Sequence, residues 1–227
     1  MGRRFIFQPL IFTLLFFTPR LLSAQAVVTG AAQLERYLPL LQGKQVALVV
    51  NQSSRVGDVH LVDTLYSRVV CLSRIFAPEH GFSGGAEAGE WIKDGYDPRT
   101  NTPIVSLYGK NKKPSVRDLE DIDVVVFDIQ DVGVRFFTYI STLFLVMEAC
   151  AAQGKELIVL DRPNPNGWYV DGPVLDPQLE SFVGIAPLPV VHGCTIGELA
   201  ELFCGEYWVW QPCENLQLTV VPCQNYN

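Results

Sequence analysis

Asp123-Val-Val-Val-Phe-Asp-Ile129 is the stretch that decides the fold of this chain, because it is its clearest strand. The four apolar residues from Val124 to Phe127 follow one another without a polar interruption. Such a run suits a strand that is buried on both faces, which is typical of a parallel sheet with helices on either side.

Apolar runs alternate with helical segments on both sides of this strand. One amphipathic helix is predicted over 138–153, with Gly154 just past its end, where helices often stop. Another is predicted over 195–204, with Thr195 as N-cap. The other predicted helices are 34–41, 60–67 and 115–121, and the other predicted strands are 45–50, 69–76, 104–107, 156–160, 189–191 (at an edge) and 216–221. This alternation predicts an α/β domain with a mostly parallel sheet covered by helices on both faces.

Residues 1–26 have the pattern of a secretory signal peptide. Arg3 and Arg4 precede a short apolar segment, and Ala24 and Ala26 provide the small residues that a signal peptidase needs. The apolar segment is too short for a transmembrane anchor, which needs about 20 residues. We therefore expect an exported protein, periplasmic or extracellular, whose residues 27–227 form one domain without a membrane span.

The charge of the chain and the spacing of its cysteines limit the partners and the disulfides that we expect. The chain has 24 acidic and 17 basic residues, a net charge of −7, which argues against nucleic acid as a partner. None of the six cysteines forms a CxxC pair, and several lie in apolar segments. Small buried thiols are therefore favoured over a disulfide framework. If a bridge exists, we expect it within the cluster of cysteines that extends from Cys194 to Cys223.

Polar residues gather directly after three predicted strands. In an open parallel sheet the carboxyl ends of the strands lie along one edge, and ligands bind in the crevice outside it. We therefore expect one shared crevice that contains Glu79, His80, Asp128, Gln130, Asp131, Asp161, Arg162 and Asn164.

Each of these residues also has a structural interpretation. Asp128 and Asp161 are able to serve as acceptors for loop N–H groups, Arg162 as a partner of Asp161, and His80 as a structural histidine. Glu79 is the hardest to explain structurally, because it lies between Pro78 and His80 with no helix to solubilise.

Cofactor chemistry finds little support in the sequence. There is no GxGxxG after the first strand and no GxxxxGK[ST] motif, and Ser53 and Ser54 lack a nucleophile elbow. Metal binding by His80, Asp128 and Asp131 is a weaker alternative. We therefore predict neither a cofactor nor a metal.

Paired carboxylates in an aromatic crevice suit glycoside hydrolysis. One protonated carboxyl protonates the leaving oxygen, and a second group acts as base or nucleophile or orients the substrate's acetamido group. We take Glu79, His80, Asp128 and Asp131 as the catalytic candidates. Trp91, Tyr96, Tyr108 and Tyr139 are candidates for stacking on sugar rings, although core packing accounts for each equally well.

Several long motifs, in order, resemble the exo-β-N-acetylmuramidases of the NamZ or YbbC type. They are APEHGFSG (77–84), SLYG (106–109), VVFDIQDVGVRFFTYIST (125–142), VLDRPNPNG (159–167) and HGCTIGELAELF (192–203). The resemblance implies a Rossmann-like N-terminal domain and release of N-acetylmuramic acid from the non-reducing end of peptidoglycan fragments, either muropeptides or disaccharides. It also implies that Glu79, the glutamate of the PEHG motif, is catalytic.

Muramic acid carries a lactyl carboxylate, which an arginine grips with two parallel hydrogen bonds. Arg135 and Arg162 are the candidates, with Arg135 ranked first, and Gln130, Tyr139, Asp161 and Asn164 complete the predicted substrate-binding set. Family members extend well beyond residue 227, so we expect this chain to lack the family's smaller C-terminal domain. A muropeptide-binding module without activity is the main alternative, and a hydrolase of amide or ester bonds is a weaker one.

Overall fold

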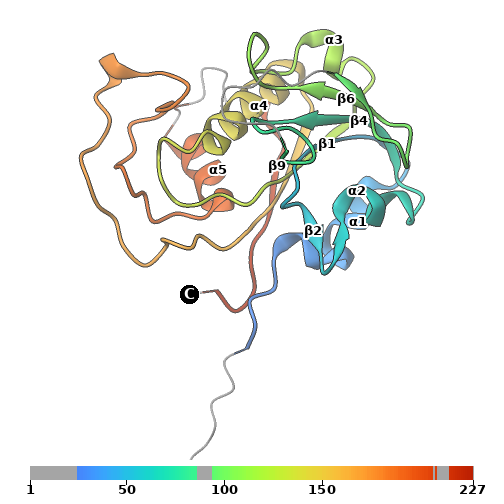
Figure 1. Ribbon diagram of the computed structural model, residues 1–227, viewed down its shortest axis with the longest axis horizontal. Helices are drawn as coiled ribbons and strands as arrows, with labels where there is room; N and C mark the ends of the chain where they lie inside the picture. Colours follow the sequence, from blue (N-terminus) through green and yellow to red (C-terminus); the bar gives the residue numbers. More distant parts are fainter. Residues whose placement is uncertain (1–24, 86–93, 207, 209–214, 227) are drawn as a thin grey trace, which may run out of the picture.

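The computed structural model describes residues 25–85, 94–206, 208 and 215–226. A twisted sheet lies between two layers of helices (Figure 1). The helices are η1 (Gly30–Ala32), α1 (Leu34–Leu41), α2 (Leu61–Tyr66), α3 (Val116–Leu119), α4 (Tyr139–Gln153), η2 (Pro177–Leu179) and α5 (Ile196–Gly205). The strands are β1 (Gln45–Val50), β2 (Arg55–Val56), β3 (Val59–His60), β4 (Cys71–Ala77), β5 (Gly95–Tyr96), β6 (Pro103–Ser106), β7 (Val124–Asp128), β8 (Glu156–Leu160) and β9 (Leu218–Val221).

The main sheet has the order β5-β6-β4-β1-β7-β8-β9 in the described part of the chain. All neighbouring strands pair in parallel except β5, which runs antiparallel to β6 at the edge. Numbered along the chain, the parallel strands follow the order 3-2-1-4-5-6, which is the doubly wound Rossmann order. The predicted α/β class and the Rossmann-like, mostly parallel sheet are confirmed.

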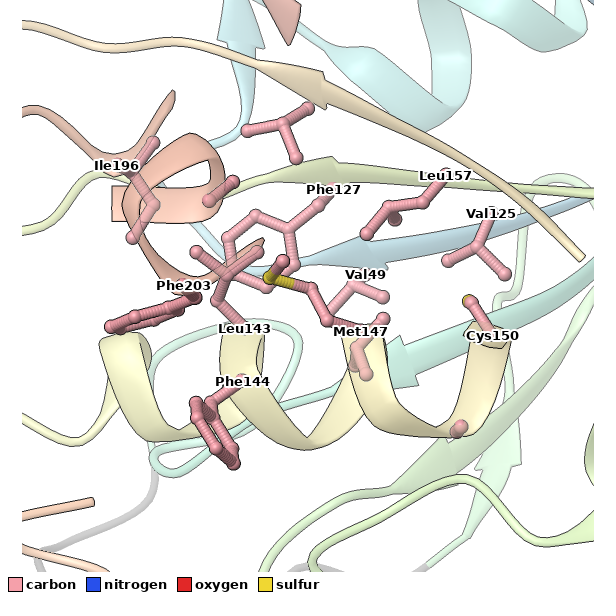
Figure 2. Close-up of a cluster of buried hydrophobic side chains, with 14 of the residues drawn as sticks. Val49, Val125, Phe127, Leu143, Phe144, Met147, Cys150, Leu157, Ile196 and Phe203 are labelled. Atoms are coloured by element: carbon pink, nitrogen blue, oxygen red, sulfur yellow. The ribbon is translucent and has the colours of Figure 1, made fainter. Parts of the chain in front are cut away.

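The apolar strand that decided the fold lies at the centre of this sheet. In β7, Val125 and Phe127 point into the core beneath α3, α4 and α5, where Val49 of β1 also packs (Figure 2). Val124 and Val126 point into the opposite core, which η1, α1 and α2 cover. Successive side chains along the strand point alternately into the two cores. Both faces of the sheet are therefore apolar, as an uninterrupted valine run predicts.

Helix α4 differs from the sequence interpretation. It ends at Gly154 as predicted, with Gly154 in the left-handed region at φ 63°. It is not amphipathic, because most of its circumference is buried, including Ser141, Thr142 and Glu148. It packs between the sheet, α3 and α5, so it has no broad solvent face.

Two further features correct the sequence interpretation. The predicted edge strand over 189–191 is absent from the described sheet, and Val191 forms only single bridges with Val134 and Asp171. The β2–β3 hairpin was not predicted, because each of its strands has only two residues. The predicted cap of α5 is confirmed, since Thr195 and Glu198 form a reciprocal capping box.

The cysteines follow the predicted pattern only in part. Cys150 is a free, fully buried thiol, but Cys71 is exposed at the start of β4. Cys194 and Cys223 are also free, while Cys204 is disulfide-bonded, within the stretch where a bridge was expected.

Among the described residues, no helix is both long and apolar enough to cross a membrane.

Candidate active site

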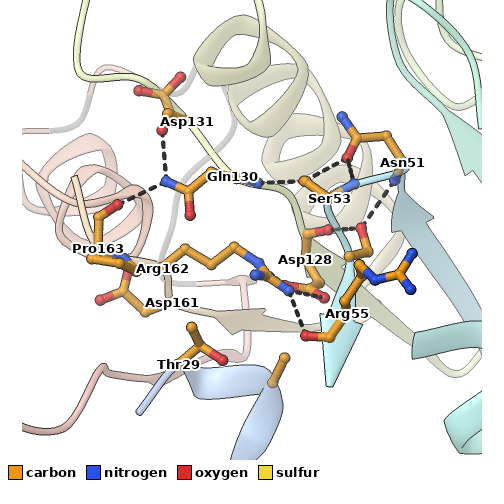
Figure 3. Close-up of polar contacts among 12 residues, drawn as sticks. Thr29, Asn51, Ser53, Arg55, Asp128, Gln130, Asp131, Asp161, Arg162 and Pro163 are labelled. Carbon is orange, nitrogen blue, oxygen red and sulfur yellow. Dashed lines mark hydrogen bonds and ion pairs between the residues drawn. The ribbon is translucent and has the colours of Figure 1, made fainter. Parts of the chain in front are cut away.

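The loops after β1, β7 and β8 meet at the carboxyl edge of the sheet around one buried ion pair (Figure 3). Arg162 donates from Nε to Oδ1 of Asp128 at 2.6 Å and from Nη2 to Oδ2 at 2.9 Å. The Asp128 side chain is fully buried and that of Arg162 is 8% exposed. Nη2 of Arg162 also donates to the carbonyl of Arg55, which ties the β2–β3 hairpin to this pair.

Asp128, predicted as a catalytic candidate, is placed by this geometry in a buried ion pair. Burial raises the pKa of Asp128, and the Arg162 guanidinium opposes that rise. Both carboxylate oxygens accept hydrogen bonds from Arg162, and the side chain has no exposed surface for a substrate to reach. Arg162 therefore pairs with Asp128 rather than with Asp161, and neither is open to a sugar carboxylate.

A second set of hydrogen bonds joins the loop after β1 to the loop after β7. Ser54 donates its hydroxyl to the carbonyl of Asp128, and the N–H of Gln130 donates to the Ser53 hydroxyl at 2.9 Å. Ser53 in turn donates to Oδ1 of Asn51 at 2.6 Å. These serines lie at the point where the order of strands along the sheet reverses, which is where doubly wound folds bind ligands.

The remaining polar candidates around Arg162 also hold loops in place. Gln130 donates from Nε2 to the carbonyls of Asp131 and Pro163, both at 2.7 Å. Asp161 accepts the Gly197 N–H at the start of α5 at 2.8 Å, and burial raises its pKa. Asn164 is buried and donates to the carbonyl of Cys194 at 2.8 Å. These residues therefore lie at one edge of the sheet, where they form a buried framework.

Glu79 lies in a different environment at the end of β4. It is half-buried and lines a cleft of about 490 Å³ together with Tyr108, Lys112, Thr138 and Phe182. The Thr138 hydroxyl, just before α4, donates to Oε2 of Glu79 at 2.6 Å. The next residue, His80, is half-buried and adopts a positive φ of 68°, so the chain turns sharply away after Glu79. Glu79 is therefore a held carboxyl that a ligand is able to reach.

Tyr139 begins α4 and directly follows Thr138, which lines the cleft. Burial raises the pKa of its hydroxyl, Asn51 and Gln52 oppose the rise by hydrogen bonding, and the charges of Glu79 and Asp131 add to it. The ring is almost fully buried and packs edge-on against Phe137 at 4.9 Å between centroids. The face of Tyr139 is therefore not free to stack on a sugar.

Asp131 is buried and faces His192, a residue that lies far from it in the sequence. Its Oδ2 accepts the Gly133 N–H at 2.7 Å and lies 3.7 Å from Nε2 of His192. Nδ1 of His192 accepts the Cys194 N–H at 3.3 Å. Oδ1 of Asp131 and Nε2 of His192 have no hydrogen-bond partner among the described residues. His192 reaches this place through the fold, and no local sequence signal indicates it.

Arg135 is hydrogen-bonded to both ends of the segment 173–188. Its Nη1 donates to the carbonyls of Pro173 at 2.9 Å and Leu188 at 2.5 Å. The segment between these carbonyls includes Phe182, which lines the cleft. Much of the hydrogen-bonding capacity of Arg135 therefore fixes one wall of the cleft. No group of three or more His, Cys, Asp or Glu side chains suited to a metal ion occurs in the described ranges.

Comparisons with known proteins decide the family. The model of the family described as "Exo-beta-N-acetylmuramidase NamZ, N-terminal" matches residues 46–227, most of the chain. This chain belongs to the NamZ N-terminal family. The predicted resemblance is therefore confirmed.

Relatives of known sequence or structure agree with the NamZ assignment. The peptidoglycan β-N-acetylmuramidase NamZ of Bacillus subtilis (strain 168) is 43% identical over 193 residues, which are 84% of this chain and 45% of that protein. Two DUF1343 family proteins of Bacteroides fragilis NCTC 9343 have similar structures. One has a TM-score of 0.78 and 42% identity over 89% of this chain and 53% of that one. The other has a TM-score of 0.80 and 40% identity, and the match covers 88% of this chain and 51% of that protein. The chain thus spans about half the length of the relatives it matches.

Within this NamZ N-terminal domain, the sequence interpretation found Glu79 and Tyr108 as candidates but not the other residues of the cleft, among them Lys112, Thr138 and Phe182. Thr138, Lys112 and Phe182 follow no motif of catalytic residues, and they meet Glu79 only because their loops share one end of the sheet. Of the other aromatic candidates, Tyr96 is exposed on β5, and Trp91 lies outside the described residues.

Proposed function

We propose that this domain carries the catalytic carboxyl of an exo-acting β-N-acetylmuramidase, which releases N-acetylmuramic acid from the non-reducing end of peptidoglycan fragments. The observation that supports this proposal best is the contrast between Glu79 and the other carboxylate candidates at this edge of the sheet. Asp128, Asp131 and Asp161 are buried and hydrogen-bonded, whereas Glu79 lines a cleft large enough for sugar units. The name of the Bacillus subtilis relative supports the same substrate class.

In this proposal Glu79 is the general acid. Thr138 donates to Oε2, which holds the carboxyl in one orientation and leaves Oε1 to carry the proton. Protonation of the glycosidic oxygen lets the leaving sugar depart as a neutral alcohol. Because Glu79 is the one carboxylate among the described lining residues of the cleft, attack by the substrate's own acetamido group fits better than attack by a second carboxylate.

A conservative substitution of Glu79 tests the assignment in the intact protein. Glu79→Gln keeps the shape of the side chain and its ability to accept from Thr138, but it cannot deliver a proton. Turnover of a natural disaccharide is expected to fall by about 10²–10⁴-fold, as for other positioned acids. An aryl glycoside with a good leaving group needs less protonation, so its loss is expected to be smaller.

Glu35→Gln is the matched control, because Glu35 is exposed on α1 on the other side of the sheet from α4. It should leave both rates unchanged. Near-normal hydrolysis of the disaccharide by Glu79→Gln, with the fold intact by circular dichroism, would rule out Glu79 as the acid. Binding without turnover by the unmodified protein would favour a muropeptide-binding module.

We also propose that the protein is exported and acts in the periplasm or outside the cell. The charged start, the short apolar segment and the small residues before Val27 support this proposal. It agrees with a peptidoglycan substrate, which lies outside the cytoplasm.

A further inference from the structure

The charge of the Glu79 cleft comes from two side chains of opposite sign. Among its described lining residues, Glu79 and Lys112 are the charged ones, and the rest are polar, apolar or aromatic. The protein as a whole is acidic, with a net charge of −7. Lys112 therefore offers a negatively charged group one local cationic partner within an otherwise acidic molecule.

Lys112 is held in the cleft by an aromatic ring. Its Nζ lies 4.3 Å from the centroid of the Phe182 ring, a cation–π geometry. Phe182 in turn lies against Tyr108, with 6.5 Å between ring centroids. No carboxylate of the described residues forms an ion pair with Lys112, whereas its neighbour Lys113 pairs with Glu148 at 2.9 Å. An ammonium group has three donors, and the ring face uses none of them as a full hydrogen bond.

We propose that Lys112 is a specificity-determining residue that binds the lactyl carboxylate of the N-acetylmuramic acid unit. This inference rests on the proposed function. The lactyl carboxylate is the group that distinguishes this sugar from N-acetylglucosamine, so a single cation in the cleft is enough to separate the two. The ring of Phe182 holds the ammonium in position before the substrate arrives, which reduces the entropy lost on binding.

Arg135 has a different part in this arrangement. Its Nη1 donates to the carbonyls of Pro173 and Leu188, on either side of the segment that contains Phe182. Arg135 is therefore a positioning residue for the wall on which Lys112 rests, and the carboxylate goes to the cation that lines the cleft.

The experiment measures binding of free N-acetylmuramic acid by calorimetry, with the lactyl amide of the same sugar as the uncharged ligand. Lys112→Met keeps most of the stem that packs on Phe182 and removes the charge. It is expected to weaken binding of the acid by about 10- to 100-fold, the usual value of a hydrogen bond to a charged group. Binding of the amide, already weak in the unmodified protein, should change by less than about threefold.

Two further variants complete the test. Lys112→Arg retains the charge and should retain most of the preference for the acid. Lys113→Met removes the same charge one residue away, outside the cleft lining, and should leave both affinities unchanged. Equal losses for acid and amide in Lys112→Met, or no loss for either, would overturn the proposal.

Binding needs no turnover, so this result is separate from that of Glu79→Gln. A loss of discrimination in Lys112→Met with normal hydrolysis by Glu79→Gln would leave Lys112 as a binding residue and refute the catalytic assignment. If Lys112→Met still discriminated between acid and amide while Glu79→Gln was slow, the catalytic assignment of Glu79 would stand and the role of Lys112 would be refuted.

Discussion

Replacing Arg162 by methionine is expected to destabilise the domain more than most single substitutions. The Asp128 carboxylate would lose both of its hydrogen bonds from Arg162, at 2.6 and 2.9 Å, while remaining fully buried. Removing one partner of a buried ion pair typically costs about 3–5 kcal/mol, because the other charge is left uncompensated. The bond to the Arg55 carbonyl would be lost as well. For a domain of this size, the midpoint temperature should fall by roughly 6–20 °C.

The size of this loss should depend on pH. Burial already raises the pKa of Asp128 above 3.8, and Arg162 opposes the rise. Without Arg162 the folded-state pKa rises further, so the folded variant binds a proton more tightly than the unfolded chain. Its stability is then highest below pH 3.8 and falls as the pH rises toward the new folded-state pKa. The difference from the unmodified protein should therefore be larger at pH 7 than at pH 4.

Urea denaturation at the two pH values, followed by circular dichroism, measures the free energies of unfolding. Arg117→Met is the control, because Arg117 is exposed on α3 and should change stability by less than about 0.5 kcal/mol. The double variant with Asp128→Asn should regain part of the loss, since the charge is no longer buried alone. A loss below about 1 kcal/mol for Arg162→Met, or one that is the same at both pH values, would refute this account of the pair.

The other predictions concern two glycines and the N-terminus. Gly133→Ala should destabilise by more than 2 kcal/mol, because a Cβ there would lie 2.1 Å from Oδ1 of Asn164 and φ is +80°. Gly109→Ala, with φ +88° but open space around it, should cost only about 1–2 kcal/mol in thermal unfolding, and equal losses for both would contradict the steric argument. N-terminal sequencing of the protein from its native host should begin at or near Val27, and an intact Met1 would contradict the proposed export.

The elements of this fold could be predicted from the sequence wherever burial dominates local structure. The strands β1 and β8 have the predicted ranges 45–50 and 156–160, and each consists of one polar residue followed by a buried apolar run, because both faces of the sheet are covered. The prediction was wrong over 189–191, where a short apolar run joins no sheet and forms only single bridges. A run of three residues does not distinguish a strand from an extended loop, since its pairing depends on distant residues.

The sequence predicts where the candidate residues lie in the fold, but it does not predict which of them are buried or which partners they have. Strand ends share an edge in any parallel sheet, so the gathering of Glu79, Asp128 and Asp161 follows from topology. Their burial does not, because it depends on which partners other loops bring. Arg162 reaches Asp128 across 34 positions of sequence, and His192 reaches Asp131 across a longer separation. Neither pairing has a local sequence signal.

The buried pair also explains how the half-buried acid Glu79 is held in position in this fold. Asp128 and Arg162 tie the loops after β7 and β8 to the β2–β3 hairpin, and Ser54 ties the loop after β1 to the same point. The chain that leaves this framework after β7 leads within ten residues to Thr138, the donor to Glu79. A buried, hydrogen-bonded framework therefore positions the residue that orients the accessible carboxyl. Substitutions in the framework should thus affect stability first and catalysis only through the position of Thr138, whereas Glu79→Gln should affect catalysis alone.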